Sequence, residues 1–179
     1  MRSTSSSSVV VVDGSSGVGE YMDVGVSSGG DPVFAYYDRT NGAARVATCG
    51  DVGCGTVSSA AIVDGVGSGS HDVGSHMSLG VIEGVGGGVD RVVLAYVDAT
   101  DGSVVTMVCA DMTCGSRTTA TLVSGVGSGS DGGRVSLSVE EGTSRVAVSF
   151  YDGTTGSLGV AVCADATVSC DVGSAEVST

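Results

Sequence analysis

The sequence predicts an all-β fold made of three tandem four-stranded β-repeats, preceded by an orphan N-terminal strand. The chain has 179 residues, among them 31 glycines, one proline and abundant Val, Ser, Thr and Ala. Glycine and β-branched residues lower helix propensity, whereas valine-rich segments interrupted by glycine are typical of short strands with tight turns. A hydrophobic content of 41% and glycines without a three-residue period exclude a disordered chain and a collagen.

One sequence unit occurs three times, and its anchor is an aspartate at Asp38, Asp98 and Asp152. An aromatic residue precedes each anchor by two positions, and a glycine, a cysteine and a second aspartate follow it by four, eleven and thirteen. A period of about 50 to 60 residues with short strands is typical of propeller blades or a β-solenoid array. We assign residues 1–18 to the orphan strand and its linker, and residues 19–67, 68–127 and 128–179 to repeats 1, 2 and 3.

The second copy illustrates the four strands expected in each repeat. The pattern predicts them at residues 77–83, 91–97, 103–109 and 117–123. The second of these strands, VVLAYV, is apolar on both faces, as a strand between two layers must be, whereas the first and fourth strands partly alternate. We therefore expect the second strand to lie deep in the fold and the fourth strand to lie at a sheet edge.

The connection between the second and third strands reads DRTNG, DATDG or DGTTG. A carboxylate at its start can accept hydrogen bonds from backbone N–H groups two or three residues later, and the final glycine tolerates a positive φ. Calcium is the weaker alternative, because a calcium loop offers several carboxylates and a closing glutamate; no other cofactor is expected. The predicted structural turn residues, which are also the weak calcium candidates, are Asp38, Asp98, Asp152, Asp51, Asp111 and Asp165.

The six cysteines form three local pairs, and the repeat symmetry favours one disulfide within each repeat among the connectivities open to six cysteines. Zinc is the alternative, but two thiolates need two further ligands, and the only histidines, His71 and His76, have no counterparts in the other copies. Disulfides imply an oxidising compartment, so we expect an extracellular or cell-surface location. The predicted pairs are Cys49–Cys54, Cys109–Cys114 and Cys163–Cys170.

The run YYDRTNGAARVATCGDVGC resembles the tandem repeats of large secreted microbial surface proteins, in which Y-Y-D-x-[ST]-[NT]-G precedes an alternating strand and a cysteine pair. The resemblance covers nearly the whole chain. It implies β-propeller-like blades, distantly similar to the Asp-box propellers of the sialidase kind, and it implies no activity. The chain departs from sialidase Asp-boxes, S-x-D-x-G-x-x-W, because it contains no tryptophan and no arginine triad that aligns with theirs.

The sequence contains no constellation typical of an enzyme. The GVGSGS runs at 65–70 and 125–130 lack the following helix that a phosphate-binding loop requires, so they are expected to be linkers between repeats. Ser70, His71 and Asp72 are sequence neighbours, which is not how catalytic triads are assembled. Glu140 and Glu141 would point to opposite faces of a strand and could not flank one glycosidic bond. We therefore expect no catalytic activity.

Charge and hydropathy restrict the partners. With 20 acidic and 7 basic residues, the chain would repel nucleic acid and anionic membranes. The apolar stretch Val9–Val12 is far too short to span a bilayer, so no membrane insertion is expected. The hydroxyl-rich run TSSSSV at 4–9 offers sites for O-linked sugars, which makes glycans a candidate modification.

The run SSSVVVVDG at 6–14 matches the fourth strands of the repeats, so the chain begins with a strand that lacks its own sheet. Three blades cannot close a propeller, and an unpaired apolar edge strand tends to pair with another chain. The predicted assembly strand consists of Val9, Val10, Val11 and Val12. We expect a structural subunit of an extracellular filament or surface fibre, self-associated by strand pairing. The alternatives are a carbohydrate- or calcium-binding, lectin-type module of a larger secreted protein and, less favoured, a sialidase-type glycosidase.

Overall fold

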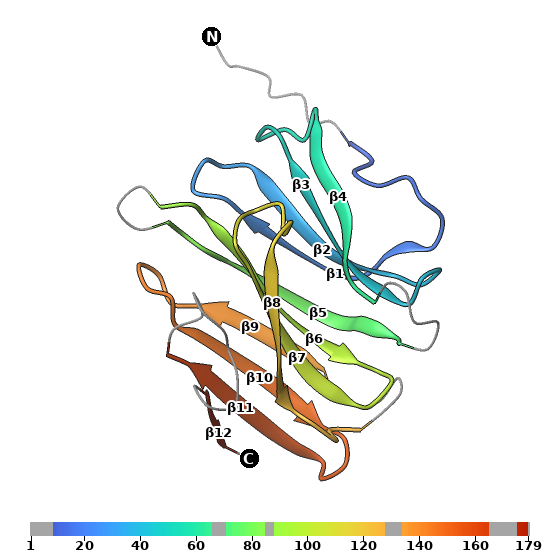
Figure 1. Cartoon of the computed structure of the whole chain (residues 1–179), viewed down its shortest axis with the longest axis vertical. Coiled ribbons are helices and arrows are strands. Elements are labelled where there is room, and N and C mark those ends of the chain that lie inside the picture. The colour runs from blue at the N-terminus through green and yellow to red at the C-terminus, as the bar shows by residue number, and fades with distance from the viewer. Residues whose placement is uncertain (1–8, 66–70, 85–87, 128–133, 165–174, 179) are drawn as a thin grey trace.

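The computed structural model describes residues 9–65, 71–84, 88–127, 134–164 and 175–178. Within these ranges the chain forms strands and connecting turns and no helix, which confirms the predicted all-β fold. The described residues contain twelve strands, which form three antiparallel sheets of four strands that are consecutive along the chain (Figure 1). The sheets are open, and each contains strands that follow one another along the chain.

The first sheet comprises β1 (Val18–Val26), β2 (Pro32–Asp38), β3 (Ala43–Cys49) and β4 (Val57–Asp64). The second sheet comprises β5 (Val73–Ile82), β6 (Arg91–Asp98), β7 (Ser103–Cys109) and β8 (Arg117–Val123). The third sheet comprises β9 (Val135–Val139), β10 (Val146–Asp152), β11 (Ser157–Cys163) and β12 (Ala175–Ser178).

The strands predicted for the second repeat agree closely with the structure, with one notable difference. The third and fourth strands have the predicted bounds, and the second strand continues by one residue to Asp98. The first strand begins at Val73 instead of Met77. A bulge accounts for this difference, because Gly74 and His76 have φ angles of 99° and 50° and shift the register between β5 and β6. Such a bulge interrupts the alternation from which the strand was predicted.

The predicted depth of the strands is also confirmed. All six residues from Val92 to Val97 in β6 are buried, so this strand is covered on both faces. The fourth strands β4 and β8 lie at sheet edges and are mostly exposed. The apolar sequence of β6 therefore reflects its place between two other layers.

Two hydrophobic cores lie between consecutive sheets. The first core joins the first and second sheets through residues such as Val46, Leu94 and Tyr96. The second core joins the second and third sheets and includes Val93 and Phe150. Figure 1 shows the three sheets following one another from the N-terminal to the C-terminal end of the molecule. Each sheet is thus stabilised mainly by burying one face against the next sheet.

Glycines let the first strands of neighbouring sheets approach one another closely. A Cβ atom on Gly25 in β1 would lie 2.5 Å from the Cδ2 atom of Leu79 in β5. A Cβ atom on Gly80 in β5 would lie 2.4 Å from the Cγ2 atom of Val139 in β9. These glycines are required by packing between sheets, since neither residue is among the positive-φ positions.

Replacing Gly80 by alanine is expected to lower the free energy of unfolding by about 1–3 kcal/mol, because the new methyl group would overpack the contact with β9. Urea denaturation would measure the change. The matched control is Ser138→Ala at the corresponding position of β9, which is exposed and should change stability little. An equal effect of the two substitutions would contradict the packing role of Gly80.

Candidate assembly surface and the repeated turns

The anchor aspartates form the structural turns that the sequence predicts. The Oδ1 atom of Asp98 accepts a hydrogen bond from the Thr100 N–H at 2.9 Å, and that of Asp152 accepts one from the Thr154 N–H at 2.8 Å. Asp38 accepts hydrogen bonds from the backbone and side-chain N–H groups of Asn41. Each carboxylate therefore has partners within its own turn.

The threonine in each turn has a further role that the sequence analysis missed. Thr40 and Thr154 donate hydroxyl hydrogen bonds at 2.8 Å to the carbonyls of Ser16 and Gly125, in the segments that enter their sheets. In the second repeat the direction is reversed, because the Asp72 N–H donates to Thr100 Oγ1 at 2.7 Å. The threonine therefore fixes the chain that enters the same sheet. The recurrence of threonine two residues after each anchor was the signal available in the sequence.

The second aspartates order the cysteine loops. In the first repeat, Asp51 accepts backbone hydrogen bonds from Gly53, Gly55 and Thr56. The hydrogen bond from the Gly55 N–H is the main reason why the pKa of Asp51 lies below its ordinary value. Asp111 accepts hydrogen bonds from the N–H and hydroxyl of Thr113, whereas Asp165 lies outside the described residues.

Two of the three predicted disulfides are present in the described residues. Cys49 is bonded to Cys54 and Cys109 to Cys114, with Cα–Cα distances of 5.0 and 4.8 Å. Cys163 is also disulfide-bonded, and its predicted partner, Cys170, lies outside the described residues. The Cys109–Cys114 disulfide belongs to the core between the first and second sheets, and Thr48 of the first sheet donates a hydrogen bond to the Met112 carbonyl within this loop. The disulfide loop is therefore part of the contact between sheets.

No described group of side chains resembles a metal site. In the ranges that the structure describes, no three His, Cys, Asp or Glu residues lie together so as to hold a metal ion. The Nδ1 atom of His71 lies 3.8 Å from Oδ2 of Asp98, and the His71 side chain is exposed. His76 packs against the Tyr21 ring, and burial lowers its pKa. Among the described residues there is also no helix that is long and apolar enough to cross a membrane.

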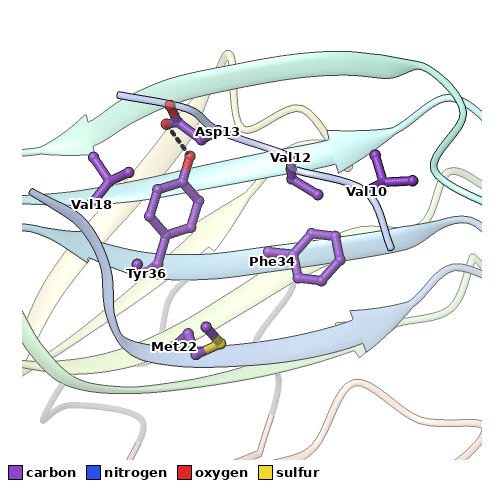
Figure 2. A pocket seen from close by; sticks show the side chains of 8 residues that line it. Val10, Val12, Asp13, Val18, Met22, Phe34 and Tyr36 are labelled. Atoms are coloured by element: carbon purple, nitrogen blue, oxygen red, sulfur yellow. Dashed lines mark hydrogen bonds between the residues drawn. The ribbon is translucent and has the colours of Figure 1, made fainter. Parts of the chain in front are cut away.

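The predicted assembly strand lies across the first sheet. The prediction of a strand here is wrong for the isolated chain: residues 9–12 form no strand, because they have no strand partner in the described part of the chain. Figure 2 shows Val10 and Val12 above Phe34 and Met22, where they line a cleft of about 310 Å³. The side chains of Val9 and Val11 are exposed, to 100% and 75%. The segment therefore covers part of the sheet and presents its other side to solvent.

A buried tyrosine and an aspartate define the position of this segment. The hydroxyl of Tyr36 in β2 donates to Asp13 at 2.7 Å (Figure 2), and that of Tyr96 in β6 donates to Asp64 at 2.6 Å. Asp64 is the last residue of β4 and accepts a hydrogen bond from the second sheet. Asp13 accepts the equivalent hydrogen bond from the first sheet, so it lies where the end of a preceding fourth strand would lie. In the third repeat both partners are replaced, by Phe150 and Ser124.

An arginine adds to this network in the first repeat only. Arg45 forms ion pairs with Asp13 at 3.3 Å and with Asp38 at 3.0 Å, and all three side chains are largely buried. Burial alone would raise the pKa of Asp38, but hydrogen bonds from Asn41 and Arg45 keep it below its ordinary value. The corresponding residues in the second and third repeats are Val105 and Gly159. These contacts hold the N-terminal segment against the first sheet.

Two apolar sheet faces at the ends of the molecule are exposed. The leading face is the side of the first sheet that points away from the second; it carries Met22, Val24, Val26 and Phe34, and the first three are 67%, 54% and 54% exposed. The trailing face is the side of the third sheet that points away from the second. It carries Tyr151, Leu158 and Val160, which are 40%, 70% and 37% exposed. Exposed apolar patches of this kind commonly mark interaction sites.

Comparison with known proteins gives no family: no protein-family model and no curated protein matches the chain. The resemblance to secreted microbial surface repeats stays a prediction. Any functional conclusion therefore depends on the two end faces, the N-terminal segment and the disulfides.

Peptide mapping without reduction should recover the peptides linked by Cys49–Cys54, Cys109–Cys114 and, by repeat symmetry, Cys163–Cys170. Each bridge closes a short loop and is expected to stabilise the fold by roughly 2 kcal/mol, which a comparison of oxidised and reduced protein in denaturant would measure. Free thiols in protein from an oxidising environment, or disulfides between repeats, would contradict the assignment.

The tyrosine–aspartate pair can be tested with the replacement that the third repeat contains. Asp64→Ser alone should destabilise the fold by about 1–3 kcal/mol, because it leaves the buried Tyr96 hydroxyl without its acceptor. Adding Tyr96→Phe to Asp64→Ser should recover part of this loss, giving a coupling of at least about 0.5 kcal/mol in a double-mutant cycle measured in denaturant. Strict additivity of the two single substitutions would show that the pair is not coupled.

Proposed function

We propose that the protein is a structural subunit of an extracellular filament or cell-surface fibre, assembled by β-strand pairing between copies of the chain. The observation that carries this proposal is the segment Val9–Val12. It lies where the fourth strand of a preceding sheet would lie, and it is not paired in the described part of the chain. Unpaired strand groups of this kind are a template for pairing with another chain.

The proposed partner is β11 of a neighbouring copy. In the first sheet, β3 pairs with β4 as far as Arg45↔Ile62 and Ala44↔Asp64. In the third sheet, the pairs between β11 and β12 run only from Val160 to Cys163. Leu158 and Gly159 correspond to Ala44 and Arg45. Within the described residues, they have no strand partner on this side.

The register of the intermolecular pair follows from the repeat. Asp13 corresponds to Asp64 because both accept the hydroxyl of the next tyrosine, so Val11 corresponds to Ile62. The proposal therefore pairs Val11 with Gly159 and Asp13 with Leu158 of the neighbouring copy. The N-terminal segment would thus extend the fourth strand of the neighbouring third sheet.

The location outside the cell is supported by the disulfides. Stable disulfides are typical of oxidising compartments. Two bridges are defined, and the loop closed by Cys109–Cys114 also takes part in packing between sheets. O-linked glycans on the hydroxyl-rich N-terminal run would fit the same location.

A calcium- or carbohydrate-binding module is the second candidate, and the turn geometry does not favour it. The described anchor and loop aspartates accept hydrogen bonds from their own backbone, as in Asp51 and Asp152. These contacts account for the aspartates as folding elements without a bound ion. We therefore prefer the structural function.

The substitution Val11→Pro tests the strand pairing. It removes the Val11 N–H from the proposed intermolecular ladder and should raise the protein concentration needed for assembly by about fivefold, since one hydrogen bond contributes about 1 kcal/mol. Electron microscopy and sedimentation of the purified protein would measure assembly, and circular dichroism would verify that the strands remain folded.

The matched control is Val9→Pro. In the proposed register Val9 corresponds to Ala60, and the residue of β11 opposite this position, Ala161, is already paired with Val177. Val9→Pro should therefore leave assembly unchanged. Equal assembly of Val11→Pro and the unmodified protein, or the absence of fibres from the unmodified protein, would contradict the proposed function.

A further inference from the structure

The internal interfaces show what normally covers the leading face of a sheet. Leu79 and Leu94 lie on the leading face of the second sheet and are 7% and 0% exposed, because the first sheet covers them. By strand pairing and distance from the anchor, the corresponding residues of the first sheet are Val24 and Phe34. Val24 is 54% exposed. The leading face of the first sheet thus has the same apolar character as the second but lacks the cover of a preceding sheet.

The trailing face shows the same relation at the other end. Ala44 and Val104 lie six residues after their anchors, on faces that the next sheet covers, and both are fully buried. Their counterpart in the third sheet is Leu158, which is 70% exposed. The trailing face of the third sheet therefore corresponds to faces that are buried elsewhere in the same chain.

We propose that the leading face of one copy docks on the trailing face of a second copy, head to tail, in the arrangement that joins consecutive sheets within the chain. The proposal deepens the function proposed above and rests on its self-association. A second copy is the occupant because it carries the surface that the internal interfaces already use. The contact is heterologous, so it leaves one leading and one trailing face free for further copies unless the ring closes.

Residue sizes at the two ends complement one another. Within the chain, Gly25 faces Leu79 and Gly80 faces Leu137. At the proposed junction the corresponding residues are Ser138 and Val24. Serine is larger than the glycine that it replaces in this contact, and valine is smaller than the leucine. This exchange keeps the volume of the contact roughly constant, which packed interfaces tolerate best.

Leu158 and the cleft of the first sheet show the same complementarity. Ala44, the counterpart of Leu158, lies directly against Gly74, where an added Cβ atom would be 2.9 Å from the Ala44 Cβ atom. The counterpart of Gly74 is Gly19, and the two residues have nearly equal φ angles, 99° at Gly74 and 98° at Gly19. Gly19 lines the cleft of about 310 Å³ beneath Val10 and Val12. The larger Leu158 side chain of a second copy would enter this cleft (Figure 2).

A repeated backbone contact sets the alignment of the first strands. The Leu79 N–H donates to Asp23 Oδ2 at 2.8 Å, and the Leu137 N–H donates to Ser78 Oγ at 3.0 Å. In the third sheet the corresponding side chain is Ser136, which is exposed. At the junction the Ser136 hydroxyl would accept a hydrogen bond from the Val24 N–H of the second copy. In the isolated chain this N–H donates to Oδ1 of Asp23 at 2.8 Å.

Charge favours these faces over the rest of the surface as the contact. The chain has a net charge of −13, so two copies repel each other at long range. The side chains named for both end faces are uncharged. Association through them should therefore strengthen as added salt screens the repulsion.

The test uses two single substitutions, Val24→Glu on the leading face and Leu158→Glu on the trailing face, with Val89→Glu as the control. Val24 and Leu158 are exposed in the isolated chain, so neither change should unfold it. Val89 is 64% exposed and lies in the connection between β5 and β6, outside both end faces. Each face variant should raise the dissociation constant for self-association by about 100-fold, because a charge would be buried at the junction. The control should associate like the unmodified protein.

Mixing the two face variants gives the decisive result. Each variant keeps one intact face, so an equimolar mixture should form a 1:1 complex that does not grow, detected by size exclusion with light scattering. If leading faces paired with each other, only Val24→Glu would lose association and mixing would restore nothing. That result, or a monomeric unmodified protein, would overturn the proposal.

The test also separates this inference from the proposed function. Fibres that persist in both face variants would overturn the docking of the two faces and leave strand pairing intact. A discrete dimer of the unmodified protein, lost in each variant and restored in the mixture, would support the docking and contradict the filament.

Discussion

The structure depends on one constraint: a sheet made of small apolar residues cannot bury both of its faces by itself. Two cores between three sheets satisfy this constraint for the middle sheet, in which Val92 to Val97 are buried on both sides. Gly25 and Gly80 bring the first strands close enough for these cores to form with few aromatic side chains. The two outer sheets each have one face buried and one face exposed. Stacking within the chain and the proposed association between chains thus follow from the same requirement.

The loops of each repeat link the sheets as well as the strands within a sheet. The turn threonines and backbone groups hold the segment that enters the same sheet, as in Thr40 with Ser16. The Cys109–Cys114 loop packs into the core against the first sheet and accepts a hydrogen bond from Thr48. The residues that define the repeat in the sequence therefore order the turns and the entering segments, and in the second repeat the cysteine loop also takes part in the contact with the first sheet. No catalytic arrangement is needed to explain why these residue types recur.

The fold could be predicted from the sequence largely because its signals are local. Fixed offsets from Asp38, Asp98 and Asp152 located the turns and the cysteine pairs, and the apolar patterns of the second repeat located its four strands. The contacts that were not predicted lie between distant residues. The hydrogen bond from Tyr36 to Asp13 and the ion pairs of Arg45 depend on how sheets and segments stack, which no spacing in the sequence reveals. The start of β5 was misplaced because positive φ angles at Gly74 and His76 interrupt the alternating pattern.

The central claim is that the exposed leading face belongs to an interface between copies of the chain. Electron cryo-microscopy of the associated protein tests it most directly, because a reconstruction shows which element lies against Met22, Val24 and Phe34. The account predicts the third sheet of a second copy at this place, with Leu158 in the cleft beside Gly19. A reconstruction in which two leading faces contact each other, or in which the leading face is bare within the assembly, would contradict it.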